Sequence, residues 1–245
     1  MFTPLHCVAL RTVRHNDSHS ILTVYSLERG RMALLLPMSA GAAAARQRAL
    51  TMPMAEFECL VDVRSSREVH RFKEIKPLIA GSHSDGYNPV RNVQAFFLAD
   101  FFGTVLREPE PDANIYRLVS ETAAAISVTD GLRLANLHIL AMIRAMRLLG
   151  VEPDAGTFSR GSFFDMMQGE WRRDITAFNS NYCLDAEKSA NAALLARMTA
   201  ANYHLYRFTR RQRREVVEGM LRYFSLHGFG SMDLSSREVL FELFD

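Results

Sequence analysis

Five arginines lie close together in the segment RFTRRQRREVV, residues 207–217. A guanidinium group is permanently charged and donates paired hydrogen bonds to phosphate and carboxylate oxygens. The chemistry that this cluster offers is the binding of an anion, such as a nucleic-acid backbone or an acidic partner. Its members are Arg207, Arg210, Arg211, Arg213 and Arg214.

A helix that begins near Arg210 must position these side chains. Thr209 followed by Gln212 is a capping-box pattern, and apolar residues then repeat at helical spacing through residue 224. At about 100° per residue, Arg210, Arg211 and Arg214 share one face of that helix. Arg213 falls at the border of this face, and Arg207 lies just outside the helix.

Local stability does not explain the cluster, because the first turn of a helix favours negative charge. Arg211 with Glu215 and Arg214 with Glu218 have the i,i+4 spacing of ion pairs. Two interpretations therefore stand side by side: a solvated helix face, or a site for an anionic partner.

A second basic set lies in residues 1–80, which carry 11 Lys and Arg against 7 Asp and Glu. Tyr25 and Phe72 lie among these cations, and charge with aromatic rings is the combination that binds single strands; core packing is the alternative for both rings. If Val24 and Leu27 face inward, strand alternation prevents all the cations from sharing one face. The candidate phosphate contacts here are Arg11, Arg14, Arg29, Arg31, Arg46, Arg48, Arg71 and Lys73, with Arg64, Arg67 and Lys76 nearby.

No catalytic motif accompanies these cations. The sequence contains no HExxH, P-loop, GxSxG or GxGxxG pattern, and its three cysteines form no CxxC pair. His138 lies among apolar helix residues and is expected to be packed, whereas His227 is expected to cap the carbonyls that end a helix. We predict a protein that is not an enzyme and needs no metal or other cofactor.

The composition is that of a globular protein. Of 245 residues, 48% are hydrophobic and 23% are charged. No apolar run reaches the roughly 18 residues that a membrane span needs, and the first residues lack the features of a secretory signal. We expect no membrane association and a cytoplasmic location.

The elements expected to carry these residues fall into two domains. Residues 1–80 contain about five strands rich in β-branched and aromatic residues, with a hairpin turn at Glu28-Arg29-Gly30 and a less regular alanine-rich stretch at 40–50. Five short strands suggest an OB-fold β-barrel, a fold that commonly binds single strands. The expected fold class is α+β.

Residues 81–245 are expected to form an all-α helical domain after a Gly-, Ser- and Pro-containing loop at 80–90. A buried helix at 90–108 stops before Pro109 and Pro111, and a second starts near Asp112. A third, within 130–154, ends at Gly150 and Pro153. Further helices are predicted at 185–201, 210–227 and 235–243.

The order of these segments resembles that of the bacterial recombination mediator family RecO. The opening VALRTVRHNDSHSILTVYSLERGRMALLLP is similar to the start of that family, and LRYFSLHGFGSMDLSSREVLFELFD is similar to its closing helix, turn and tail. FFLADFFGTVLREPEPDANIYRLV and LLGVEPD resemble its internal helix ends. The resemblance spans nearly the whole chain.

Two departures from the family pattern matter. Many members carry a four-cysteine zinc module after the Leu-Gly-x-x-Pro segment, whereas AGTFSRGSFFDMMQGEWRRD contains no cysteine. The family's basic segment after the third strand is replaced here by LLLPMSAGAAAARQRAL, in which Arg46 and Arg48 are the nearest cations.

The resemblance implies a DNA-repair protein that binds single- and double-stranded DNA and anneals complementary strands. With RecR it would help to load RecA onto strands coated by single-strand-binding protein, at the bacterial nucleoid. It also implies a site for the acidic, apolar C-terminal tail of single-strand-binding protein, with Arg133, Arg144 and Arg147 as candidates. Arg210, Arg211 and Arg214 would extend the DNA path or meet an acidic partner.

Two functions of other classes stay open. A protein adaptor without direct DNA contact would show no salt-dependent DNA affinity. A nuclease or nucleotide-dependent enzyme would show turnover that depends on metal or nucleotide.

Overall fold

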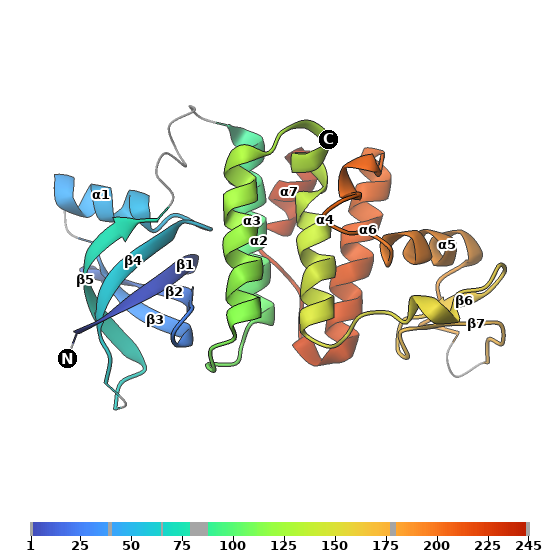
Figure 1. Cartoon of the computed structure of the whole chain (residues 1–245), viewed down its shortest axis with the longest axis horizontal. Helices are drawn as coiled ribbons and strands as arrows, with labels where there is room; N and C mark the ends of the chain where they lie inside the picture. Colours follow the sequence, from blue (N-terminus) through green and yellow to red (C-terminus); the bar gives the residue numbers. More distant parts are fainter. Residues whose placement is uncertain (1, 39–40, 65, 79–87, 177–179, 244–245) are drawn as a thin grey trace. The chain divides into compact units, whose positions relative to one another are not determined.

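The computed structural model describes residues 2–38, 41–64, 66–78, 88–176 and 180–243. It is an α+β structure in which a β-barrel is followed by a mainly helical region, as predicted (Figure 1). The chain divides into two compact units, Met1–Thr129 with Leu234–Asp245, and Asp130–Asp233. The predicted domain boundary between residues 80 and 81 lies outside the described residues and stays a prediction.

Five strands close the barrel in the order β1-β2-β3-β5-β4. They are β1 (Phe2–Arg14), β2 (His19–Ser26), β3 (Gly30–Pro37), β4 (Glu56–Asp62) and β5 (Val69–Pro77). All pairs are antiparallel except β3 with β5. Alternate residues such as Leu22, Val24 and Leu34 fill the interior, because side chains alternate between the two faces of a strand.

Helix α1 (Ala42–Leu50) joins β3 to β4 and contacts β5. The alanine-rich stretch that was expected to be less regular is therefore helical from Ala42, in keeping with the high helix propensity of alanine. Because the barrel has five strands and a helix between the third and the fourth, it is OB-like.

Three helices belong to the first unit together with the barrel: α2 (Pro89–Val105), α3 (Ala113–Val128) and α7 (Arg237–Leu243). Phe97, Phe101 and Phe102 of α2 are fully buried, as the continuous apolar pattern predicted. α2 contacts β1, α3 and α7. Asp100 accepts hydrogen bonds from the backbone and hydroxyl of Ser236, which attaches the C-terminal segment to α2.

The second unit contains α4 (Gly131–Leu148), α5 (Ala186–Leu195), α6 (Arg210–Phe224) and the short helices η1 (Ala155–Thr157), η2 (Tyr203–Leu205) and η3 (Ser225–Phe229). Gly150 follows α4 with φ of 73°, the left-handed conformation expected of a helix-ending glycine. In the described parts of the chain, no helix has the length and apolar character that crossing a membrane requires.

The prediction of an all-α region after the barrel is wrong in one part. A small hairpin is present there, formed by β6 (Phe163–Asp165) and β7 (Glu170–Arg172). The rings of Phe164 and Trp171 lie 4.5 Å apart, and the indole N–H of Trp171 donates to the Ser189 carbonyl. The hairpin occupies the cysteine-free segment. Among the described residues, no group of three His, Cys, Asp or Glu side chains could hold a metal ion.

Candidate nucleic-acid interface

The outer side of strand β1 carries the first two predicted contacts. A bulge lies between Ala9 and Arg11, after which Arg11 stands opposite Thr23 of β2. Because a bulge re-aims the side chains beyond it, Arg11 points away from the barrel core and is exposed. Arg14 is also exposed but forms a 2.6 Å ion pair with Asp17. Of these two arginines, Arg11 is the one that forms no ion pair with an acid among the described residues.

The turn between β2 and β3 carries Arg29 and leads into Arg31. Arg29 is exposed, whereas Arg31 is half-buried. Nη1 of Arg31 donates to the carbonyl oxygens of Gly103, at 2.8 Å, and Leu106, at 2.9 Å. Carbonyls at the end of a helix have no partner within it, so Arg31 has a structural role at the end of α2.

Strand β5 and helix α1 carry the other predicted contacts of the barrel. Nζ of the exposed Lys73 lies 4.2 Å from the centre of the Phe2 ring and 3.6 Å from a Glu74 oxygen. Because α1 contacts β5, these cations belong to the same side of the barrel. The exposed ones are Arg46, Arg71 and Lys73, and Arg48 is half-buried.

Asp62, near the end of β4, lowers the positive charge of this side. Arg64 pairs with it at 2.9 Å and Arg67 at 3.9 Å. Burial opposes ionisation of Asp62, but the charge of Arg64 and hydrogen bonds leave its pKa below the ordinary value. Arg64 and Arg67 therefore contribute less free positive charge than the sequence suggested.

The two aromatic residues expected near the cations are packing residues. Tyr25 is buried, and its hydroxyl accepts a hydrogen bond from the backbone N–H of Asp112. Phe72 packs against the barrel core. Val24 faces inward as expected, but Leu27 lies exposed in the turn. Neither aromatic ring offers the open face that base stacking requires.

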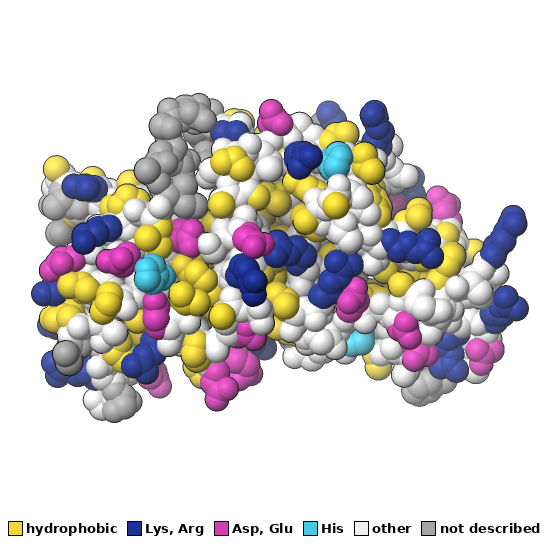
Figure 2. Space-filling view, in the orientation of Figure 1, with side chains coloured by type: hydrophobic (Ala, Val, Ile, Leu, Met, Phe, Trp, Pro, Cys, Tyr) yellow, Lys and Arg dark blue, Asp and Glu magenta, His cyan; other side chains and the backbone are white. Residues whose placement is uncertain are grey.

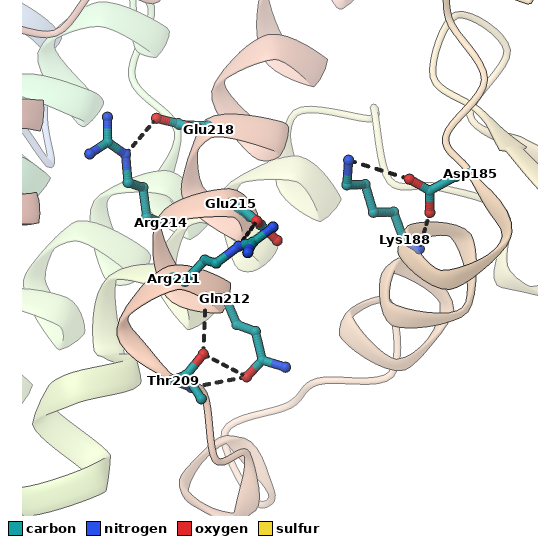
Figure 3. A network of polar contacts seen from close by, with 8 residues as sticks. All are labelled: Asp185, Lys188, Thr209, Arg211, Gln212, Arg214, Glu215 and Glu218. Atoms are coloured by element: carbon teal, nitrogen blue, oxygen red, sulfur yellow. Dashed lines mark hydrogen bonds and ion pairs between the residues drawn. The ribbon is translucent and has the colours of Figure 1, made fainter.

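Helix α6 begins with the predicted capping box between Thr209 and Gln212 (Figure 3). Arg211 bonds to Glu215 at 2.8 Å and Arg214 to Glu218 at 3.0 Å. Figure 3 shows each of the two guanidinium groups directed toward the acid one turn later. The i,i+4 pairing predicted from the sequence is thus present.

Arg210, which opens α6, is exposed, and no acid pairs with it in the described part of the chain. Arg207, before the helix, is exposed as well. Of the α6 face predicted to bind an anion, Arg210 is therefore the member whose charge is not compensated by an ion pair.

Arg213 has a different environment from the rest of the cluster. Only 6% of its surface is exposed, and Nη2 donates to Oδ1 of Asn136 at 3.3 Å. The Asn136 amide in turn donates to the carbonyls of Tyr203 and Tyr206. The residue expected at the border of the charged face is thus part of the packing between α4 and α6.

His138, also on α4, is a packed residue as expected. It is fully buried, and burial first and the charge of Arg213 second lower its pKa to about 3. The imidazole is therefore neutral at physiological pH. His227 was expected to cap its own helix, but its Nε2 contacts the Met166 carbonyl at the hairpin instead.

The three arginines predicted to bind a partner differ in their contacts along α4. Arg133 is exposed at the start of the helix, and Arg144 is half-buried. Arg147 pairs with Glu152 at 2.6 Å and donates to the Ala196 carbonyl at the end of α5. This contact brings Arg147 beside α5, whose Leu194 is 54% exposed.

One cation escaped sequence reasoning. Arg107 lies next to the carbonyls that Arg31 binds, and its Nε donates to the Thr104 carbonyl at 3.0 Å. Glu108, Glu110 and Asp112 follow it closely in the sequence. On the face in Figure 2, Lys and Arg side chains lie among hydrophobic and acidic ones, so sequence proximity alone does not identify a basic patch.

The fold and its exposed arginines define an OB-like barrel protein with helical additions, a class that includes nucleic-acid-binding proteins. The DNA repair protein RecO of Porphyromonas gingivalis is 31% identical over 244 residues, and that of Bacteroides fragilis is 26% identical over 238 residues. Each alignment covers 97% of both chains. The RecO protein of Christiangramia forsetii is 21% identical with the same coverage. No protein-family model matches the chain. The chain belongs to the RecO family of DNA repair proteins.

Proposed function

We propose that this protein is a non-enzymatic recombination mediator that binds single- and double-stranded DNA and anneals complementary strands. The observation that carries the proposal is an OB-like barrel that exposes arginines without acidic partners in the described chain. Those arginines are Arg11, Arg29, Arg46 and Arg71.

The physical basis is neutralisation of backbone phosphates. Arginines that replace condensed counterions lower the repulsion between two strands, and affinity then falls steeply with salt and depends little on base sequence. Annealing by this route needs no catalytic residue. We propose as DNA contacts Arg11, Arg14, Arg29, Arg31, Arg46, Arg48, Arg71, Lys73, Arg210, Arg211 and Arg214.

With RecR, the protein would help RecA to load onto DNA coated by single-strand-binding protein. The acidic, apolar C-terminal tail of that protein would bind along α4, where Arg133, Arg144 and Arg147 supply charge. Leu194, which is exposed on the helix whose end Arg147 contacts, supplies apolar surface. A site with both properties suits a peptide that carries both carboxylates and apolar side chains.

The experiment is fluorescence anisotropy of a labelled, unstructured oligonucleotide across a salt series, followed by an annealing assay with two complementary strands. We expect tight binding at low salt, a steep negative slope of log affinity against log salt, and faster annealing with protein present. Absence of binding at every salt concentration would favour an adaptor that reaches DNA only through its protein partners.

The partner site is tested separately. A labelled peptide ending in the acidic, apolar tail is expected to bind the protein, and Arg144→Glu with Arg147→Glu is expected to weaken it at least tenfold, a loss of about 1.4 kcal/mol. Equal binding by the variant would remove these two residues from the proposed site.

A further inference from the structure

The carbonyl end of helix α2 gathers two guanidinium groups. Nη1 of Arg31 donates to the carbonyls of Gly103 and Leu106, and Nε of Arg107 donates to the carbonyl of Thr104. Because these three acceptors belong to the last turn of one helix, Arg31 and Arg107 lie side by side there.

Arg11 reaches the same place from strand β1. Its neighbour Leu10 packs against the end of α2, where a Cβ built on Gly103 would lie 3.9 Å from the Leu10 Cβ. The Gly103 carbonyl is one of the two that Arg31 binds. Arg11 and Arg31 both point outward from the barrel, since Arg11 stands opposite Thr23, and Arg31 stands opposite Tyr25, two residues further along β2.

The effect of neighbouring charges on Arg31 agrees with this placement. Burial lowers the pKa of Arg31, and the positive charges of Arg107 and then Arg11 lower it further. Among the described residues, no acid offsets this repulsion. The nearby Asp112 caps helix α3 by accepting the backbone N–H groups of Asn114 and Ile115.

Helix capping accounts for only part of this arrangement. A helix C-terminus carries about half a negative charge, and Arg31 and Arg107 already satisfy three of its carbonyls. Arg11 has no acidic or carbonyl partner among the described residues. Three cations around half a negative charge leave an excess of positive charge at an exposed position.

We propose that Arg11, Arg31 and Arg107 form a binding site for one phosphate of a nucleic-acid backbone, held at the end of α2. Arg31 is the fixed member, because its carbonyl hydrogen bonds orient it. The exposed Arg11 and Arg107 bind the phosphate from β1 and from the segment that follows α2. Planar guanidinium groups donate paired hydrogen bonds that match phosphate oxygens. This inference rests on the proposed DNA binding and adds Arg107, which sequence reasoning had left out.

The test compares the wild-type protein with Arg11→Gln/Arg107→Gln, which leaves Arg31 and its carbonyl contacts in place. The control is Arg117→Gln/Arg160→Gln, which removes the same charge from two exposed positions. In the salt series, we expect the first variant to bind the oligonucleotide about tenfold more weakly, with a slope smaller by about 0.7. The control is expected to stay within about twofold of wild type.

Each other result has its own meaning. Equal losses in both double variants would overturn the site and leave only general charge attraction. A wild-type protein that binds with a steep salt slope, together with an unaffected first variant, overturns the site but keeps the proposed function. A wild-type protein that does not bind at any salt overturns both.

Inorganic tripolyphosphate distinguishes a strand from a free phosphate compound. Its effect on the melting temperature is measured for all three proteins. If the first variant loses tripolyphosphate stabilisation and keeps full oligonucleotide affinity, the site takes small phosphates and the nucleic-acid assignment is wrong. Reduced binding of both ligands by that variant alone supports the assignment.

Discussion

The end of α2 and the start of α6 both gather arginines, but by opposite means. At α6 the residues are neighbours in sequence at the amide end of a helix, where positive charge is unfavourable. Glu215 and Glu218 pair with two of them there. At α2 the residues come from β1, from β3 and from the segment that follows the helix, at the carbonyl end that favours cations.

This comparison shows that a run of arginines and a concentration of free positive charge are different things. The run at 207–214 contains two paired arginines and the buried Arg213. The three arginines at α2 are far apart in the sequence, and no acid among the described residues raises the pKa of Arg31. Compensation by acids, and not the number of arginines, separates the two helix ends.

The largest expected effect concerns the buried member of the α6 run. Asn136→Leu removes the amide that joins Arg213 to the carbonyls of Tyr203 and Tyr206. Leaving buried polar groups short of partners should lower the free energy of unfolding by about 3 kcal/mol. Urea unfolding measures it, with the exposed Arg210→Gln as the control. If the free energy of unfolding falls no more than in the control, the contact of Arg213 with Asn136 does not stabilise the protein.

The next effect is a pH dependence of stability that comes from His138 of α4, which lies near the charge of Arg213 on α6. The pKa of His138 is about 3 in the folded protein and about 6.5 when unfolded. The unfolded chain therefore binds more protons between these values, and stability falls as pH falls, by about 1.4 kcal/mol per unit from this group. Urea unfolding at pH 7 and pH 5 should show a smaller loss for His138→Leu than for wild type. Equal losses would mean that His138 does not control this window.

A smaller effect is expected when the exposed α6 charges are removed. Arg210→Gln/Arg211→Gln/Arg214→Gln should weaken oligonucleotide binding about threefold, less than the two changes at α2, because two of the three arginines already have acidic partners. Anisotropy at the same salt concentrations measures it. A loss larger than that of Arg11→Gln/Arg107→Gln would reverse the ranking of the two helix ends.

The sequence predicts features that depend on near neighbours. Alternating apolar residues predict the barrel strands, and Thr209 with Gln212 predicts where α6 begins. The spacing of Arg211 and Arg214 from Glu215 and Glu218 predicts their ion pairs. Each of these depends on a backbone period that residues close in the chain share.

Features that depend on contacts between residues far apart in the chain could not be predicted from the sequence pattern. The three-residue strands of the hairpin are stabilised by Trp171, whose indole N–H donates to the Ser189 carbonyl and whose ring lies 4.5 Å from that of Phe164. The burial of Arg213 depends on Asn136 in another helix. Acids follow Arg107 in the sequence, yet its side chain bonds to the Thr104 carbonyl in the last turn of α2.

The smallest expected effect tests compensation itself. Glu215→Gln/Glu218→Gln keeps every arginine of α6 and removes the two acids that pair with Arg211 and Arg214. If these acids limit the attraction of α6 for phosphates, oligonucleotide affinity should rise about twofold and the salt slope should steepen. The matched change Glu170→Gln/Glu242→Gln alters net charge equally at exposed positions outside α6. A rise in affinity for the first variant alone would show that the ion pairs weaken the attraction of the α6 arginines for phosphates. An equal rise in both variants would assign the effect to net charge.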